Sequence, residues 1–210
     1  MLKELILEKR QKYSFIGILL YVVSTVFVCY LSFKIITDVQ TWNALFWIIL
    51  LFSSVSAVAK SFISEKPETQ LYLYTITSPE SIILSKLIYN AGMMIFLALL
   101  CFGIYSLFLG NVAVDIPLFT ISIVLGGVGL SSLFTMISAI ASKADNSSVL
   151  IAILGFPIIL PFLITIIKLS TNAIVGAEWS ESYQYLGVLA LLNLIVVTLS
   201  YILFPYLWKE

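Results

Sequence analysis

The chain contains no histidine and only two cysteines among its 210 residues. Histidine is the commonest general base, metal ligand and axial haem ligand, so its absence removes the side chain on which most such sites depend. Cys29 and Cys101 each lie inside an apolar run and form no C-x-x-C pair. We therefore expect two buried structural thiols, and neither a zinc site nor a structural disulfide.

Charged side chains are also scarce. They make up 10% of the chain, whereas 61% of the residues are hydrophobic and the mean hydropathy is +1.10. This number of charges is too small to cover a surface that faces water. Most of the protein therefore has lipid as its solvent. Acidic and basic residues balance to a net charge of zero, which gives no electrostatic case for a nucleic-acid partner.

Six apolar stretches are long enough to cross the hydrocarbon core of a bilayer, which takes about 20 residues. We place them at approximately 15–36, 42–62, 82–109, 116–141, 147–169 and 185–207. The first follows basic residues, as a signal peptide does, but it is too long and lacks an A-x-A-like cleavage site. The sequence predicts an all-α integral membrane protein with one transmembrane domain over 1–210. The alternative is a different helix count, if prolines interrupt the fifth stretch.

The distribution of basic residues predicts the orientation. If the N-terminus is cytoplasmic, nine lysines and arginines fall on the inner side and two on the outer side. The inner set is Lys3, Lys9, Arg10, Lys12, Lys60, Lys66, Lys86, Lys143 and Lys209, and the outer set is Lys34 and Lys168. Because positive charge accumulates on the cytoplasmic side, we expect both termini inside. Lys60 and Lys86, near helix ends, are expected to extend toward the headgroups.

The first 13 residues place Leu2, Leu5 and Ile6 on one helical face and charged residues around the rest. This spacing favours a short amphipathic helix that lies along the cytoplasmic interface. The alternative is a solvated basic tail that only sets the topology.

The longest cytoplasmic connection joins the second and third stretches. Pro67 and Glu68 suit the first turn of a short helix over 67–77, and Ser78-Pro79-Glu80 is a second start signal. The short helix is apolar but cannot span, so it lies in the headgroups or is covered by another protein. Its candidate docking residues are Pro67, Glu68, Leu71, Leu73, Tyr74 and Ile76.

Two features inside the predicted spans concern helix packing. Gly126, Gly127, Gly129 and Ser131 give the fourth span a small-residue face, which lets helices approach closely in lipid and which we expect to contact a second copy. Pro157 and Pro161 each remove a backbone donor from the fifth span and predict a helix break or a bend. The outer loop that follows is expected at 170–183, with Trp179 as an interfacial anchor.

Chemical machinery is missing from the sequence. No Asp, Glu or Arg lies in the middle of a predicted span, and no G-x-x-x-x-G-K-[ST] loop is present. We therefore expect no catalytic residue, and any energised transport must draw on a separate ATPase subunit.

The stretch LFSSVSAVAKSFISEKPETQLYLYTITSPESIILSKL and the later GFPIILPFLI resemble heme exporter protein B (CcmB). The length and the helix number and order agree over nearly the whole chain, and Ser53, Ser54, Pro79 and Lys86 match the family pattern. The family often has a Gly-x-Leu-Glu run in the short helix, where this chain has Glu68-Thr69-Gln70-Leu71.

The resemblance implies an ABC-2-like permease in the bacterial inner membrane that acts in haem export or delivery for c-type cytochromes. It also implies partners: a CcmA-like ATPase docked on the short coupling helix, a second copy of the chain, and CcmC-like and CcmD-like subunits. Haem would be cargo of the complex, with no cofactor held tightly by this chain. Two alternatives stay open, namely an ABC-2-type permease for a lipid or peptide and a non-transporting structural subunit.

Overall fold

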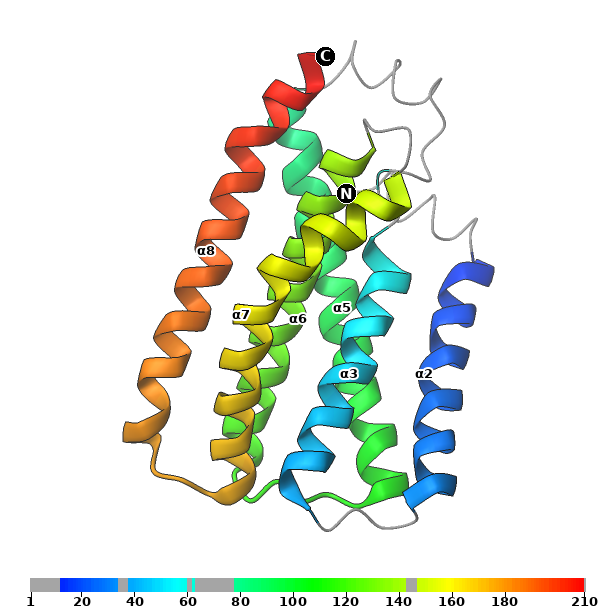
Figure 1. The fold of residues 1–210 in the computed structure, drawn as a ribbon, viewed down its shortest axis with the longest axis vertical. Coiled ribbons are helices and arrows are strands. Elements are labelled where there is room, and N and C mark those ends of the chain that lie inside the picture. The colour runs from blue at the N-terminus through cyan, green and yellow to red at the C-terminus, as the bar shows by residue number, and fades with distance from the viewer. Residues whose placement is uncertain (1–11, 34–37, 60–61, 63–77, 143–146, 210) are drawn as a thin grey trace.

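The computed structural model describes residues 12–33, 38–59, 62, 78–142 and 147–209, and its regular elements are α-helices. In chain order they are α2 (Lys12–Phe33), α3 (Val39–Val58), α5 (Pro79–Leu109), α6 (Ile116–Ala141), α7 (Ser147–Val175) and α8 (Trp179–Lys209) (Figure 1). By length and composition, all six are candidate membrane spans. The predicted all-helical fold with six candidate spans is confirmed. The expected interfacial helix falls mainly on 1–11, outside the described residues.

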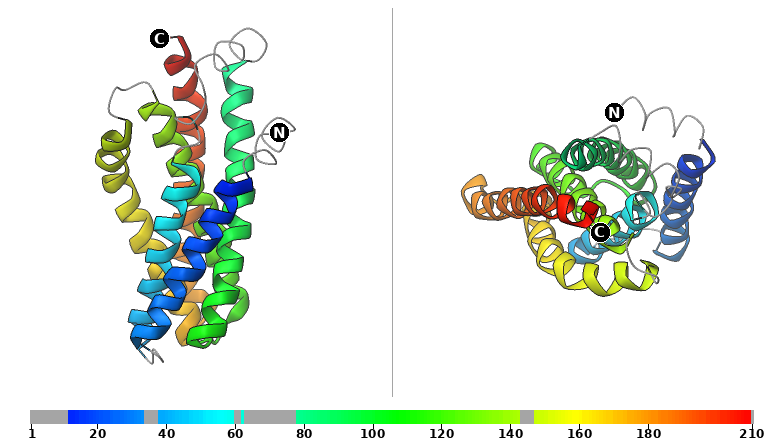
Figure 2. Two further views of the ribbon diagram at one scale, coloured as in Figure 1. Left: turned by 90° about the vertical axis from the view of Figure 1, so that its right-hand side faces the viewer. Right: turned by 90° about the horizontal axis from the view of Figure 1, so that it is seen from above.

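Consecutive helices run in opposite directions, so the bundle has two distinct ends (Figures 1 and 2). At one end α3, α6 and α8 finish and α2, α5 and α7 begin. We call it the Phe62 end, after the residue that follows α3 there. The opposite end is the Trp42 end, after the tryptophan in the first turn of α3. The sequence predicts that the Phe62 end faces the cytoplasm.

Helix α6 lies at the centre of the bundle and packs against α3, α5, α7 and α8. Every side chain from Leu130 to Ala139 is buried. The other helices turn large apolar side chains outward, among them Leu20 on α2, Phe96 on α5 and Leu194 on α8. A bundle with a buried central helix and an apolar exterior is what a lipid solvent favours.

Helix α5 begins where the Ser-Pro-Glu start signal predicts. Pro79 is its first residue, Glu80 lies in the first turn, and Ser78 has the extended backbone of an N-cap (φ −70°, ψ 145°). The Ser78 side chain makes no capping bond to the helix backbone. Its hydroxyl instead lies 2.9 Å from the hydroxyl of Ser81. The proline and its conformation therefore define this start more than the cap does.

The outer loop expected at 170–183 is mostly helical. Helix α7 continues to Val175 and α8 begins at Trp179. Between them Gly176 adopts a positive φ of 74°, and its N–H and that of Ala177 donate to the Asn172 carbonyl (3.0 Å each). A glycine in the left-handed region ends α7, because this conformation is strained for other residues.

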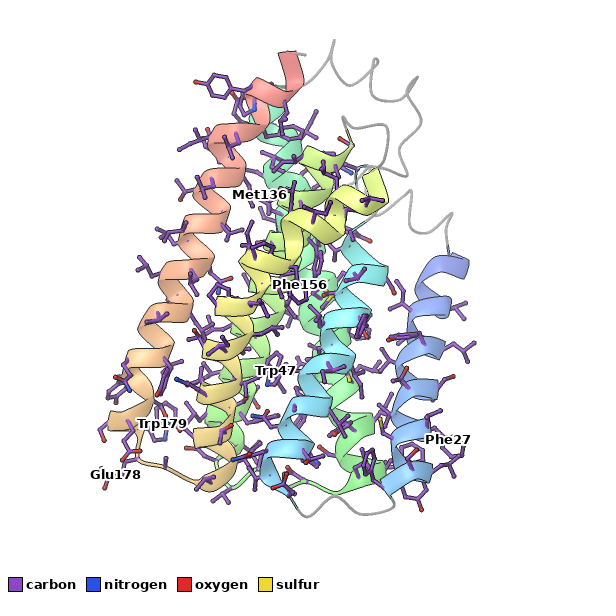
Figure 3. The ribbon with its side chains drawn as sticks, in the orientation of Figure 1. Phe27, Trp47, Met136, Phe156, Glu178 and Trp179 are labelled. Atoms are coloured by element: carbon purple, nitrogen blue, oxygen red, sulfur yellow. The ribbon has the colours of Figure 1, made fainter. Side chains whose placement is uncertain are left out.

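The two prolines of α7 do not break it. Pro157 and Pro161 lie inside one continuous helix, which bends along its length (Figures 1 and 2). Of the break and the bend that the prolines predicted, the structure has the bend, which is what proline causes inside a continuous helix. The bend separates two unlike halves. Ile166 and Leu169, toward the Trp42 end, are fully buried, whereas Ile153 and Phe156 are 63% and 68% exposed (Figure 3).

Candidate functional site

The predicted docking residues Pro67, Glu68, Leu71, Leu73, Tyr74 and Ile76 lie outside the described residues. The structure does describe the chain on both sides of them, at Phe62 and from Ser78 onward. The candidate site is therefore built from the residues that connect this segment to the helices.

Phe62 follows α3 and contacts three other helices. Its backbone N–H donates to the hydroxyl of Ser138 on α6, at 3.0 Å. The Nζ atom of Lys86, on α5, lies 4.3 Å from the centroid of the Phe62 ring. The Phe204 ring of α8 lies 5.2 Å from the Phe62 ring, centroid to centroid, at an interplanar angle of 45°. Phe62 itself is only 4% exposed.

These contacts belong to a small apolar cluster, separate from the main core of the bundle. Its buried members are Phe62, Ile82, Ile83, Leu87, Ala139 and Phe204. Lys86 is buried beside it at 2% exposure, so it does not extend toward the headgroups as the sequence suggested. Burying an ammonium group is costly, and the aromatic face of Phe62 offsets part of that cost.

At the Trp42 end, a polar network joins α3 to α7. Asn43 Nδ2 donates to the Ile167 carbonyl (3.0 Å) and to the Thr171 hydroxyl (2.9 Å). Trp47 Nε1 donates to the Ser170 hydroxyl at 2.8 Å, and that hydroxyl lies 2.9 Å from Asn43 Oδ1. Asn43 and Ser170 are fully buried. The network therefore pairs the buried amide and indole groups that two membrane helices bring together.

The same end holds an aromatic cluster. Trp42 Nε1 donates to the Gly110 carbonyl (3.1 Å), and the Tyr105 hydroxyl donates to the Trp42 carbonyl (3.0 Å). The Trp42 and Tyr105 rings meet edge to face, with centroids 4.8 Å apart, and Phe46 and Phe119 pack around Trp42. Two hydrogen bonds and this ring packing tie α3 to the last turn of α5.

Further bonds complete this end. The Asp115 N–H donates to the Ala173 carbonyl (2.9 Å), which joins the start of α6 to the end of α7. Asn172 Nδ2 donates to the Ser182 hydroxyl of α8 (3.2 Å). Asp38 caps α3, and the hydrogen bonds from the Thr41 side chain and backbone hold the pKa of its carboxyl below the usual range.

The small residues predicted for helix packing are buried, namely Gly126, Gly127, Gly129 and Ser131. A Cβ added at Gly126 would lie 2.5 Å from the Trp47 ring, which approaches from α3. A Cβ at Gly129 would overlap the Phe162 ring of α7. These glycines therefore admit large rings from neighbouring helices of the same chain.

Gly127 lies against the backbone of α5, where an added Cβ would come within 3.5 Å of the Ile95 Cα. The small-residue face is thus covered by α3, α5 and α7 of the same chain. The expectation that it faces a second copy does not hold, because the chain's own helices occupy it.

Three buried amides were not singled out from the sequence. Besides Asn43, Asn90 Nδ2 of α5 donates to the Thr135 hydroxyl of α6 (2.8 Å). Asn193 of α8 donates to the Leu189 carbonyl (2.9 Å) and lies 3.4 Å from the Leu125 carbonyl of α6. The sequence does contain a signal for them, namely an asparagine inside a predicted span. A buried amide in a membrane helix needs hydrogen-bond partners, and each of these three has one on a second helix.

Polar side chains lie at several of the contacts between helices. Within the described ranges no group of three or more His, Cys, Asp or Glu side chains could hold a metal ion. Several buried amides join two helices, namely Asn43, Asn90 and Asn193, and the ammonium group of Lys86 lies over the Phe62 ring.

The chain matches the model of a protein family. The family described as CcmB protein matches residues 1–203, which is nearly the whole chain. No curated protein and no solved structure matches the chain significantly.

Proposed function

The chain belongs to the CcmB family, and we propose that it is the membrane permease subunit of an ABC transporter-type complex that a separate ATPase drives. Family membership implies the membrane component of the cytochrome c maturation haem export system. The proposed task is haem export or delivery for c-type cytochrome biogenesis.

One observation carries the proposal, namely the family match over residues 1–203. The six candidate spans agree with a multi-pass, permease-type membrane subunit. The sequence has no phosphate-binding loop of the G-x-x-x-x-G-K-[ST] type, so ATP hydrolysis belongs to a partner. The proposed partners are a CcmA-like ATPase, a second copy of this chain, and CcmC-like and CcmD-like subunits in a bacterial inner membrane.

In this proposal the ATPase docks on the segment 67–77. Its candidate contacts are Pro67, Glu68, Leu71, Leu73, Tyr74 and Ile76. Haem is cargo of the complex and not a cofactor of this chain, which offers no histidine as an axial ligand. The chain acts by transmitting ATPase closure into the bundle.

Docking is tested by the double substitution Leu71→Ala with Leu73→Ala. Interface anchors each contribute about 1–3 kcal/mol, so the variant should enter the membrane normally but release the ATPase on co-purification. The matched control is Leu191→Ala with Leu194→Ala, which truncates two outward leucines of α8 (57% and 64% exposed). If the double variant retains the ATPase and cells keep normal cytochromes, docking on 67–77 is wrong.

The task itself is tested by deleting the gene and staining membranes for covalently bound haem. The proposal predicts loss of c-type cytochromes and recovery when the gene is restored. Normal cytochromes would instead favour a permease for a lipid or peptide. If adding this chain does not stimulate the ATPase, a non-transporting structural subunit is the better description.

A further inference from the structure

We propose that Phe62 is the joint through which movement of the docking segment enters α5, α6 and α8. The inference rests on the proposed function, because it assumes that an ATPase acts on residues 67–77. It concerns a residue that the docking contacts do not include. Phe62 precedes Pro67 by five positions in the chain and is itself buried in the bundle.

The geometry of Phe62 supports this role through its main chain and its side chain together. The N–H bond to Ser138 attaches the backbone of Phe62 to α6 (3.0 Å). The ring contacts the Lys86 ammonium group of α5 and the Phe204 ring of α8. A displacement of Phe62 must therefore move these helices or break the contacts.

The two ring contacts of Phe62 can persist while the helices shift relative to one another. A cation over a ring and two tilted rings are attracted over a range of offsets, because the ring quadrupole is spread over its faces and edges. A hydrogen bond is more directional and weakens steeply as its angle closes. Among the described contacts of Phe62, the bond to α6 is directional, whereas the ring contacts with α5 and α8 tolerate sliding.

The test uses the aromatic ring of Phe62, which leucine lacks. Leucine at position 62 would fill most of the apolar cluster but has no quadrupole to face Lys86. The substitution Phe62→Leu should therefore preserve the fold and weaken the coupling. The matched control is Phe52→Leu, which changes an outward phenylalanine of the same helix α3 (54% exposed).

The experiment compares three readouts in the complete complex: the amount of subunit in the membrane, the ATPase that co-purifies with it, and haem attached to c-type cytochromes. We expect Phe62→Leu to keep the first two and to lower haem attachment about tenfold for the same ATP hydrolysis. Phe52→Leu should match the wild type in all three. A purely structural role would instead lower the amount of subunit and all the other readouts in proportion.

A second variant keeps the test decisive if Phe62→Leu fails to accumulate. Phe204→Leu changes the partner ring on α8, far along the chain from the docking segment, and should give the same selective loss of haem attachment. Normal haem attachment in every accumulating variant would overturn the joint. Loss of the ATPase from the wild-type complex, or normal cytochromes after gene deletion, would instead refute the proposed function.

Discussion

At the Trp42 end, hydrogen bonds join α3 to α5 and to α7, α6 to α7, and α7 to α8. At the Phe62 end, the described contacts between helices include the Phe62 ring against the Lys86 ammonium group and the Phe204 ring, and the bond from the Phe62 N–H to Ser138. The first set is directional and lies in a low-dielectric interior, where breaking a bond leaves a polar group unpaired. In the second set the bond to Ser138 is directional, whereas the contacts of the Phe62 ring with the Lys86 ammonium group and with the Phe204 ring tolerate displacement.

We interpret the difference as a division of labour. We propose that the Trp42 end is the fixed base of the bundle and that movement enters at the Phe62 end. The bend of α7 fits this division, because the half that carries Ser170 is buried against α3 and α6, whereas the half that carries Phe156 is largely exposed. Thiol labelling tests the orientation of both ends, and the stability variants perturb the Trp42 end.

The largest effect is expected from labelling, which decides which end is cytoplasmic. In a background with Cys29→Ala and Cys101→Ala, Asn111→Cys at the Trp42 end should react fully with an impermeant external thiol reagent. Asn146→Cys, in the connection between α6 and α7, should react only after the membrane is opened. The reverse pattern would invert the topology and place the joint on the outside.

Crowding the base should cost the most stability. Gly126→Ala places a Cβ against the Trp47 ring, whose indole donates to Ser170, so the ring cannot move without loosening that bond. We expect a loss of about 1–3 kcal/mol, measured by unfolding in detergent. Gly92→Ala is the control, since no atom lies within 4 Å of its added Cβ. Equal stability of the two variants would mean that the Trp47 packing is not tight.

Removing the Asn43 amide at the Trp42 end should lower the free energy of unfolding somewhat less than Gly126→Ala does. Asn43→Leu deletes the bonds to Ile167 and Thr171 and the acceptor near Ser170. Hydrogen bonds between membrane helices contribute about 0.6 kcal/mol on average, so we expect a loss of about 1–2 kcal/mol for the set. Gln184→Leu, on an exposed position of α8, should leave the unfolding midpoint unchanged. A stabilised Asn43→Leu protein would show that the network restrains the bundle for function alone.

The smallest effect concerns the start of α6. Asp115 Oδ1 accepts from the Leu118 N–H (2.9 Å), while the Asp115 backbone makes the separate bond to Ala173. Asp115→Ala should lose the cap and about 1 kcal/mol, whereas Asp115→Asn retains an acceptor and should lose little. Thermal unfolding of the two variants side by side measures the difference. Similar losses in both would point to the carboxylate charge instead of the cap.

The sequence predicts the spans well because lipid imposes one strong rule, a run of about 20 apolar residues per crossing. It also locates the start of α5, because proline and an extended serine act locally. It misses the true end of α7. Ser170, Thr171 and Asn172 resemble a loop, and only their partners on α3 and α8 make them helical residues.

The candidate site was less predictable for the same reason. Phe62 is one aromatic residue among many, and its importance comes from Lys86, Ser138 and Phe204, which the fold brings together from distant parts of the chain. Likewise, Gly126 indicates close helix packing, but the sequence does not say whether the partner helix belongs to the same chain. Such contacts depend on tertiary arrangement and leave no local signature.

The most direct test of the division between the two ends is a pair of distance measurements on the complex with its ATPase. Spin labels at Ser81→Cys and Tyr206→Cys report on the Phe62 end, and labels at Asn111→Cys and Glu181→Cys report on the Trp42 end, all at exposed positions. Distances are compared without nucleotide and with the ATPase trapped by ATP and vanadate. The account predicts that the 81–206 distance changes and the 111–181 distance does not. A change confined to the 111–181 pair, or equal changes in both, would contradict it.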